Sequence, residues 1–161
     1  MFNPISYLCI VLKACLVVLM IAIASLTFYQ VVMRYGLNKS SSWTEEAIRF
    51  VFIWCSFLAV AMGVREKIHI GINVIVEVFN KKIQLIVEII GYFAIMFLSV
   101  YLIYYGWLVV LATRFQTSPG LGVPMSWVYS SVPTMGVLTT IFCLEKIIKA
   151  VLEFLAGHKE L

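Results

Sequence analysis

The chain has 161 residues, of which 63% are hydrophobic and only 12% charged, and its mean hydropathy is +1.02. Soluble domains carry about a quarter charged residues and roughly half apolar ones, and a globule of this size could not enclose so much apolar surface. A soluble enzyme, a disordered chain and a nucleic-acid-binding domain are therefore excluded, the last also because the 12 Lys and Arg residues are scattered. The composition indicates an integral membrane protein.

Four stretches of the sequence are long and apolar enough to cross a bilayer, whose ~30 Å hydrocarbon core needs about 20 residues of helix. They cover residues 14–33, 48–64, 83–113 and 127–144. The third spans about 31 residues, so it must tilt or project beyond the lipid. We expect an all-α integral membrane protein in which residues 1–161 form a single domain of four transmembrane helices.

The distribution of Lys and Arg around these spans predicts the orientation of the chain. The N-terminal flank, the loop between spans two and three and the C-terminal tail together carry about eight, against about four on the other side. Both termini are therefore expected in the cytoplasm. Aromatic rings prefer the membrane interfaces, and those expected at the outer boundary agree with this orientation: Tyr35, Trp43, Tyr104, Tyr105, Trp107, Trp127 and Tyr129.

Two connecting segments have informative patterns. Apolar residues alternate with period two over residues 68–79, which on pattern alone is typical of a strand. A lone strand at the bilayer would leave its backbone unpaired, and the same residues also fit helical spacing. We therefore expect a short amphipathic helix in the cytoplasmic interface between spans two and three. The outer loop at residues 116–124 is rich in Gly and Pro and is predicted to be ordered but not helical.

A cluster of polar residues marks the start of the second span. Ser42 and Glu45 have the spacing of a capping box, and Glu45 and Arg49 are i,i+4 neighbours on one helical face. One interpretation is a capped helix start with a local ion pair. Arg49, however, lies nearly two turns into the span, where a charge costs up to ~3 kcal/mol at the bilayer centre. The other interpretation is that Glu46 and Arg49 contact polar groups of a partner subunit.

The sequence offers little for catalysis, cofactors or metals. The four cysteines lie in apolar stretches, and neither outer loop holds the cysteine pair that a membrane thiol oxidase needs. His69 is expected beside lipid headgroups and His158 lies in the tail, so haem ligation by two histidines within the spans is excluded. No Asp is present, and no set of ligands has metal-site spacing. Glu88, near the cytoplasmic end of the third span, is the one candidate for a proton relay, with contact to headgroups or a partner as the alternative.

Three stretches of the chain resemble the small membrane subunit of tripartite ATP-independent periplasmic (TRAP) transporters, the DctQ-like small permeases. They are VVMRY at 31–35, WTEEAIRF at 43–50 with Trp54, Arg65, His69 and Ile70, and GVPMSWVY at 122–129 with Pro133 and Gly136. Their order and spacing fit the family over about residues 31–136. Asn73 departs from the pattern, because the family often has an acid a few residues after the His-Ile pair.

This resemblance implies a division of labour between three proteins. In such transporters a periplasmic binding protein captures the substrate, typically an organic acid such as a dicarboxylate or a sialic acid. A large membrane subunit then carries the substrate across the bacterial inner membrane, coupled to sodium. The small subunit is not an enzyme and needs no cofactor: it supports the large subunit and helps the binding protein dock.

The implied partners are thus the large TRAP membrane subunit, the periplasmic substrate-binding protein and membrane lipids, and not nucleic acid. The candidate interface residues are Arg34, Trp43, Glu45, Glu46, Arg49, Trp54, His69, Pro124 and Trp127. The alternative is a stand-alone small membrane transporter or channel. Such a protein needs polar or charged residues along a path through the midplane, whereas the middles of these spans are almost wholly aliphatic and aromatic.

Overall fold

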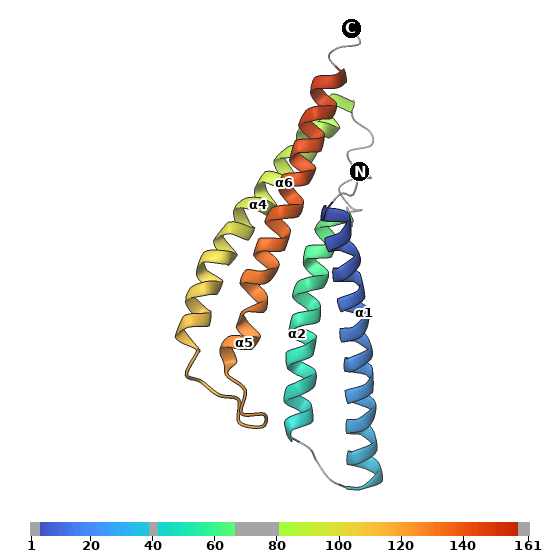
Figure 1. Cartoon of the computed structure of the whole chain (residues 1–161), viewed down its shortest axis with the longest axis vertical. Helices are drawn as coiled ribbons and strands as arrows, with labels where there is room; N and C mark the ends of the chain where they lie inside the picture. The colour runs from blue at the N-terminus through green and yellow to red at the C-terminus, as the bar shows by residue number, and fades with distance from the viewer. Residues whose placement is uncertain (1–3, 39–41, 67–80, 158–161) are drawn as a thin grey trace.

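The computed structural model describes residues 4–38, 42–66 and 81–157, and its regular elements are all helical. Along the chain these elements are α1 (Pro4–Val31), the π-helical turn η1 (Val32–Gly36), α2 (Ser42–Arg65), α4 (Lys81–Ala112), the short α5 (Met125–Tyr129) and α6 (Ser131–Gly157) (Figure 1). The predicted interfacial helix at 68–79, and His69 within it, lie outside the described residues.

Three of these segments are long and apolar enough to cross a membrane: Ile5–Gly36, Ser42–Arg65 and Ile86–Ala112. They confirm the expected helical membrane protein. Helix α6 is not among the three, so the fourth span stays a prediction. Helices α1, α2 and α6 extend past the predicted spans. The additional residues of α1 are themselves largely apolar, and its candidate span begins at Ile5 rather than at residue 14. Helices α2 and α6 continue through polar flanking residues.

The predicted span at 127–144 is interrupted in the structure. Helix α5 ends at Tyr129, and α6 begins at Ser131 and continues to Gly157. Pro133 accounts for the start of α6 at this point: a proline lacks the backbone N–H but has a φ suited to the first turn of a helix. The interruption is confined to Ser130, which keeps a helical backbone and donates its N–H to the Ser126 carbonyl at 3.0 Å, so α5 leads directly into α6.

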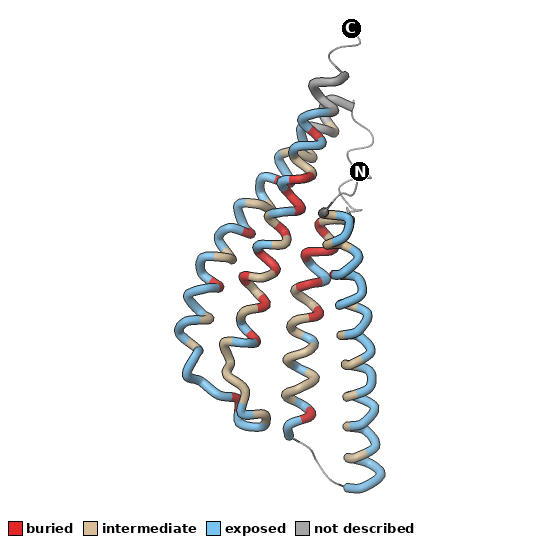
Figure 2. The backbone as a smooth tube through the Cα atoms, in the orientation of Figure 1, coloured by how far each residue is buried: buried red, intermediate tan, exposed pale blue. Residues whose placement is uncertain are grey.

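The long helices form a single row in the order α1, α2, α6, α4 (Figure 1). Helix α1 packs against α2, α2 against α6, and α6 against α4. In a closed four-helix bundle α1 would also pack against α4 or α6. Within the described residues, the backbone of α1 contacts neither of them. Figure 2 shows the consequence: buried positions gather on α2 and α6, while α1 and α4 are mostly exposed.

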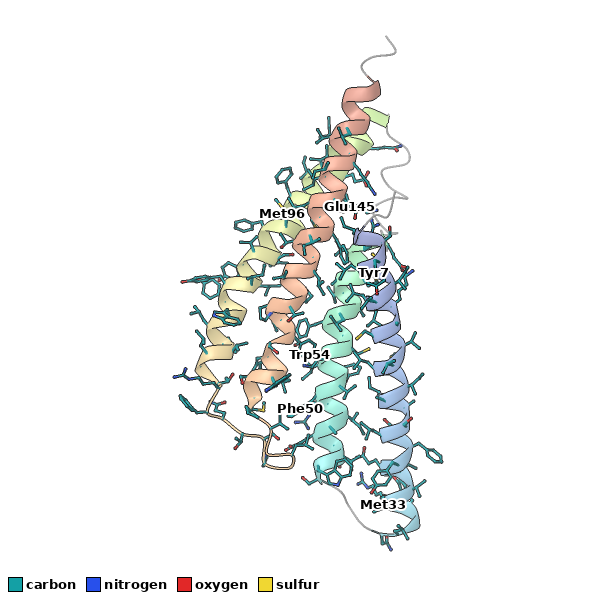
Figure 3. The ribbon with its side chains drawn as sticks, viewed as in Figure 1. Tyr7, Met33, Phe50, Trp54, Met96 and Glu145 are labelled. Atoms are coloured by element: carbon teal, nitrogen blue, oxygen red, sulfur yellow. The ribbon has the colours of Figure 1, made fainter. Side chains whose placement is uncertain are left out.

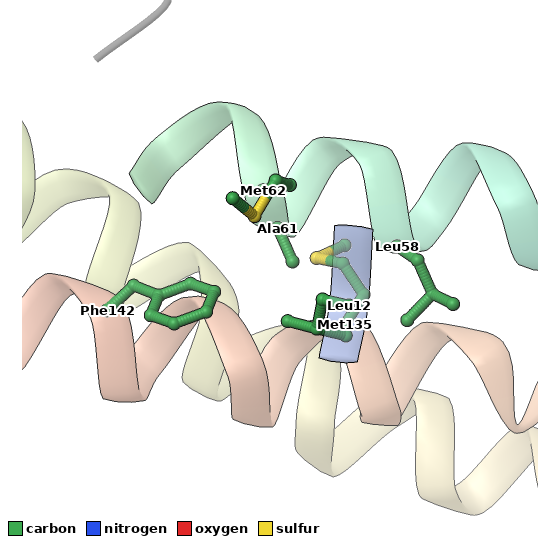
Figure 4. Packing of buried hydrophobic residues seen from close by; sticks show 6 residues of the cluster. All are labelled: Leu12, Leu58, Ala61, Met62, Met135 and Phe142. Atoms are coloured by element: carbon green, nitrogen blue, oxygen red, sulfur yellow. The ribbon is translucent and has the colours of Figure 1, made fainter. Parts of the chain in front are cut away.

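The apolar core lies where α1, α2 and α6 meet (Figure 4). Its buried members are Leu12, Leu58, Ala61, Met62, Met135 and Phe142. A second, smaller cluster of Val64, Tyr92 and Cys143 joins α2, α4 and α6. Between them the two clusters connect all four long helices through side chains.

Small residues allow α4 and α6 to pack closely. A Cβ added at Gly136 would lie 2.7 Å from Ile103 Cγ1 and 2.9 Å from the Ser99 carbonyl oxygen. Ser99 is only 3% exposed, and its hydroxyl donates to the carbonyl of Ile95 at 2.8 Å. Close packing of this kind is the main source of helix association in lipid, where apolar side chains gain nothing by leaving their surroundings.

Candidate functional site

The most extensive polar contact in the described chain lies at one end of the helix row. We call this the loop end, because it contains the loop at residues 113–124, α5 and the start of α2. Glu46, in the second turn of α2, accepts hydrogen bonds from the backbone N–H of Gly120, at 3.0 Å to each carboxylate oxygen. The N–H of Leu121 also donates to Glu46 Oε2 at 3.0 Å. A carboxylate binds backbone N–H groups strongly because the hydrogen bonds are charge-assisted, so Glu46 fixes the loop against α2.

Gly120 allows the carboxylate to approach the backbone closely. A Cβ at this position would lie 2.9 Å from Glu46 Cδ, closer than a real Cβ approaches, so the end of the Glu46 side chain would have to shift. The remainder of the loop is held by its own backbone: Ser118 N–H donates to the Val123 carbonyl, and Gly122 N–H to the Ser118 carbonyl, each at 2.9 Å. The prediction of an ordered, non-helical loop is therefore confirmed.

A second contact joins α2 to α5. The indole Nε1 of Trp54 donates to the backbone carbonyl of Trp127 at 3.1 Å. Trp54 lies about two turns after Glu46 on the same side of α2, facing α5 and α6 (Figure 3). The Trp127 ring itself is 67% exposed, and Pro124 precedes α5 at its N-cap. Helix α2 thus contacts both the loop and α5, which also packs against α4 and α6.

Two further candidates contact α1. Gln30 Nε2 donates to Glu45 Oε1 at 3.2 Å, and the rings of Tyr29 and Trp43 lie 6.0 Å apart. Among the described residues, neither bond of the predicted capping box nor the predicted Glu45–Arg49 ion pair is formed. That local interpretation was wrong because Gln30, on the neighbouring helix, binds the Glu45 carboxylate instead.

The remaining cationic candidates are on the surface. Arg34 lies in η1 and Arg49 on α2, and both are exposed. Within the part of the chain that the structure describes, Arg49 forms neither a hydrogen bond nor an ion pair. Whether these residues contact a partner stays a prediction.

The opposite end of the row holds an ionic cluster that sequence reasoning missed. We call this the terminal end, because α1 begins and α6 ends there (Figure 1). Glu145, with a side chain only 7% exposed, lies 3.1 Å from Arg65 Nη1 and 2.6 Å from Lys149 Nζ. Lys13 and Glu66 form a more exposed pair at 2.5 Å. The cluster connects α1, α2 and α6, and no sequence signal links residues so far apart in the chain.

The chemistry of these contacts is structural. Among the described residues, no group of three or more His, Cys, Asp or Glu side chains could hold a metal ion. Glu88 Oε1 accepts a hydrogen bond from the Tyr92 hydroxyl at 3.3 Å, one turn along α4. Most of the polar groups described above connect helices and loops of this chain, while Arg34 and Arg49 are exposed on its surface. These features define a helical membrane protein held together in part by polar contacts between its helices.

Comparison with known proteins identifies the family. Residues 23–153 match the family model of the tripartite ATP-independent periplasmic transporters, DctQ component. The chain belongs to this family, the small permease subunits of TRAP transporters, and is therefore a transporter subunit rather than an enzyme. The family expected from the sequence is confirmed.

Three relatives illustrate the range of the family. A TRAP transporter small permease protein of Haemophilus influenzae is 29% identical over 83% of this chain and 83% of its own length. The sialic acid TRAP transporter small permease protein SiaQ of Vibrio cholerae is 26% identical over 80% of this chain and 75% of its own. The isethionate TRAP transporter permease protein DctMQ of Oleidesulfovibrio alaskensis is 30% identical over 75% of this chain, but the match covers only 20% of that protein.

Proposed function

We propose that this chain supports the large transport subunit of a sodium-coupled TRAP transporter in the bacterial inner membrane and helps a periplasmic binding protein to dock. The transported substrate would be an organic acid of the dicarboxylate or sialic acid class. The observation that carries the proposal is the open row of helices. Most of the polar side chains in this row bind other parts of the same chain, and the exposed helix faces are broad and apolar.

The same row argues against a stand-alone transporter or channel. A path through the membrane needs polar groups arranged around a midplane route. The described helices form one layer, with α1 and α4 at opposite edges. Their buried positions are mostly apolar, with Phe142 fully buried. The buried hydroxyls of Ser99 and Thr139 bond within their own helices. Such a layer lines no route of its own.

Two of the relatives support the assignment of partners and substrate. In the Oleidesulfovibrio protein the matching part is a fifth of the length, which leaves room for a large permease on the same chain. The relatives named for sialic acid and isethionate transport organic anions of different chemistry. This difference supports substrate selection by the other two proteins of the system rather than by the small subunit.

The charges support an orientation with the loop end in the periplasm and four spans, the fourth formed by α5 and α6. Lys13, Arg65 and Lys149 cluster at the terminal end, as expected for the cytoplasmic side. At the loop end, Glu46 holds the loop in one conformation beside the exposed Trp127 ring. A fixed loop with an exposed aromatic ring is a suitable surface for a soluble partner, because little ordering is needed on binding.

The test is reconstitution into liposomes. Vesicles containing this chain and its large subunit, with the binding protein outside, are expected to take up the organic acid when a sodium gradient is imposed. Vesicles containing this chain alone are expected to show no uptake above empty vesicles. Sodium-driven uptake by this chain alone would overturn the proposal in favour of a stand-alone transporter.

A further inference from the structure

One face of α2 remains uncovered by the other described helices. At 100° per residue, five positions fall within one sector of this helix: Arg49, Phe52, Ser56, Ala59 and Gly63. Arg49, Phe52 and Ala59 are exposed, Ser56 and Gly63 partly so, and a Cβ added at Gly63 would meet nothing within 4 Å. We call this surface the Arg49 face.

Other uncovered faces of the row suit lipid well. On α4 the exposed side carries a stripe of large apolar and aromatic residues: Ile90, Phe93, Phe97, Tyr101 and Tyr105. On α1 the exposed residues in the middle of the helix include Val17, Val18 and Ile21. Side chains of this kind meet lipid tails without cost. The Arg49 face differs, because it combines a charge with small residues.

Within the described chain Arg49 interacts electrostatically with Glu46, one turn before it, but forms no hydrogen bond or ion-pair contact. The two acids that precede it, Glu45 and Glu46, are engaged by Gln30 and by the loop. Arg49 also lies about 10 Å along the helix from Ser42, within an apolar span. A cation inside a span usually faces protein or water rather than lipid tails. The guanidinium of Arg49 is therefore available for direct contact with a polar group from outside the described chain.

We propose that the Arg49 face is where a transmembrane helix of the large subunit packs, with a carboxylate or carbonyl group of that helix bound to Arg49. This inference rests on the proposed function, which supplies the large subunit as the occupant. Ser56, Ala59 and Gly63 allow the two backbones to approach closely, and close approach is the main source of helix association in lipid. The guanidinium supplies the polar contact that fixes the register.

The decisive substitution is Ala59→Leu, which fills the space that the partner helix would occupy. Two matched controls make the same change at exposed alanines on other helices: Ala24→Leu on α1 and Ala94→Leu on α4. The tagged chain is co-expressed with the large subunit and purified in mild detergent. Ala59→Leu is expected to lower recovery of the large subunit by about fivefold or more, which corresponds to about 1 kcal/mol. Each control is expected to retain wild-type recovery, with all variants present in membranes at equal amounts.

The possible contrary outcomes distinguish a failure of this inference from a failure of the proposed function on which it rests. Undiminished recovery with Ala59→Leu, together with loss in either control, would move the contact to another face and leave the proposed function intact. Failure of the unsubstituted chain to recover any large membrane subunit would remove the proposed function itself. A photo-reactive amino acid at position 59 gives a second readout. A cross-link to the large subunit is expected, and a cross-link between two copies of this chain would overturn the inference.

Discussion

Glu46 and Gly120 lie 74 residues apart in the chain, yet the carboxylate of one binds the backbone N–H of the other through both oxygens at 3.0 Å. The contact joins the second turn of α2 to the loop that precedes α5. It requires an acid on one side and the absence of a side chain on the other. Each requirement gives a prediction.

Replacing Glu46 with Ala should free the loop. The N–H groups of Gly120 and Leu121 lose their acceptor, and their hydrogen exchange in detergent micelles should accelerate by about tenfold or more, as local opening no longer breaks a charge-assisted bond. The control is Glu45→Ala, which removes a neighbouring acid that contacts Gln30 instead. Equal exchange in the wild type and in Glu46→Ala would show that the loop is held by its own backbone alone.

Replacing Gly120 with Ala should also accelerate hydrogen exchange in the loop, in this case because an added side chain displaces the Glu46 carboxylate. The new Cβ would lie 2.9 Å from Glu46 Cδ, so the carboxylate must move away from the loop. Because both substitutions remove one interaction, the double variant with Glu46→Ala should exchange no faster than either single variant. If the double variant exchanged faster than both single variants, by the product of their effects, the contact between Glu46 and Gly120 would be contradicted.

Replacing Gly136 with Ala should separate α4 from α6. The added Cβ meets the Ser99 carbonyl oxygen at 2.9 Å, and a backbone atom cannot move aside as a side chain can. We expect a loss of about 1–3 kcal/mol in the free energy of unfolding, as for other overpacked cores, measured by denaturation in mixed micelles. Gly91→Ala on α4 is the matched control, because a Cβ there meets nothing within 4 Å. An unchanged stability for Gly136→Ala would place the two helices further apart than the structure does.

Replacing Arg65 with Met should destabilise the terminal end. Glu145 has a side chain only 7% exposed and lies 3.1 Å from Arg65, so the substitution leaves a buried carboxylate with the half-exposed Lys149 as its remaining counter-ion, at a cost of about 3 kcal/mol. Lys149→Met is the comparison: it also removes a partner of Glu145, but the Lys149 side chain is 51% exposed, so part of its contribution is screened by solvent and the loss should be smaller. Combining Arg65→Met with Glu145→Leu should recover most of the loss. A double variant as unstable as Arg65→Met would show that the ion pair is not the cause.

Reporter fusions test the proposed orientation. Alkaline phosphatase, which is active only in the periplasm, should be inactive when fused after residue 161 and active when inserted in the loop near Gly120. The reason is the concentration of cations at the terminal end. The reverse pattern of activity would place the loop end in the cytoplasm.

The membrane class and three of the spans were predictable because they depend on composition and helix length alone. The ordered loop was predictable from its glycines and prolines. The contacts of single residues were not. Glu45 was expected to pair with Arg49 one turn away, but it binds Gln30 on α1, because a nearby helix competes with local partners.

Two of the polar contacts between distant segments had no sequence signal at all. Nothing in the sequence relates Glu46 to Gly120, or Arg65 to Glu145, since each pair depends on how helices are arranged in space. The arrangement of the helices in a single row could not be predicted from the sequence either. Four apolar stretches fit a closed bundle as well as a single layer, and hydropathy does not distinguish the two.

Because the helices form one layer, each edge helix has one long helix as its backbone neighbour: α1 packs along α2, and α4 packs along α6 with the short α5 at its end. Lipid or detergent molecules therefore contact most of the helix surface. They occupy the positions where a second long helix would pack in a closed bundle. The thickness and composition of the surrounding amphiphile should thus influence the tilt of α1 and α4 more than that of the two central helices. The choice of detergent or nanodisc lipid becomes in effect a structural variable for this subunit when it is isolated.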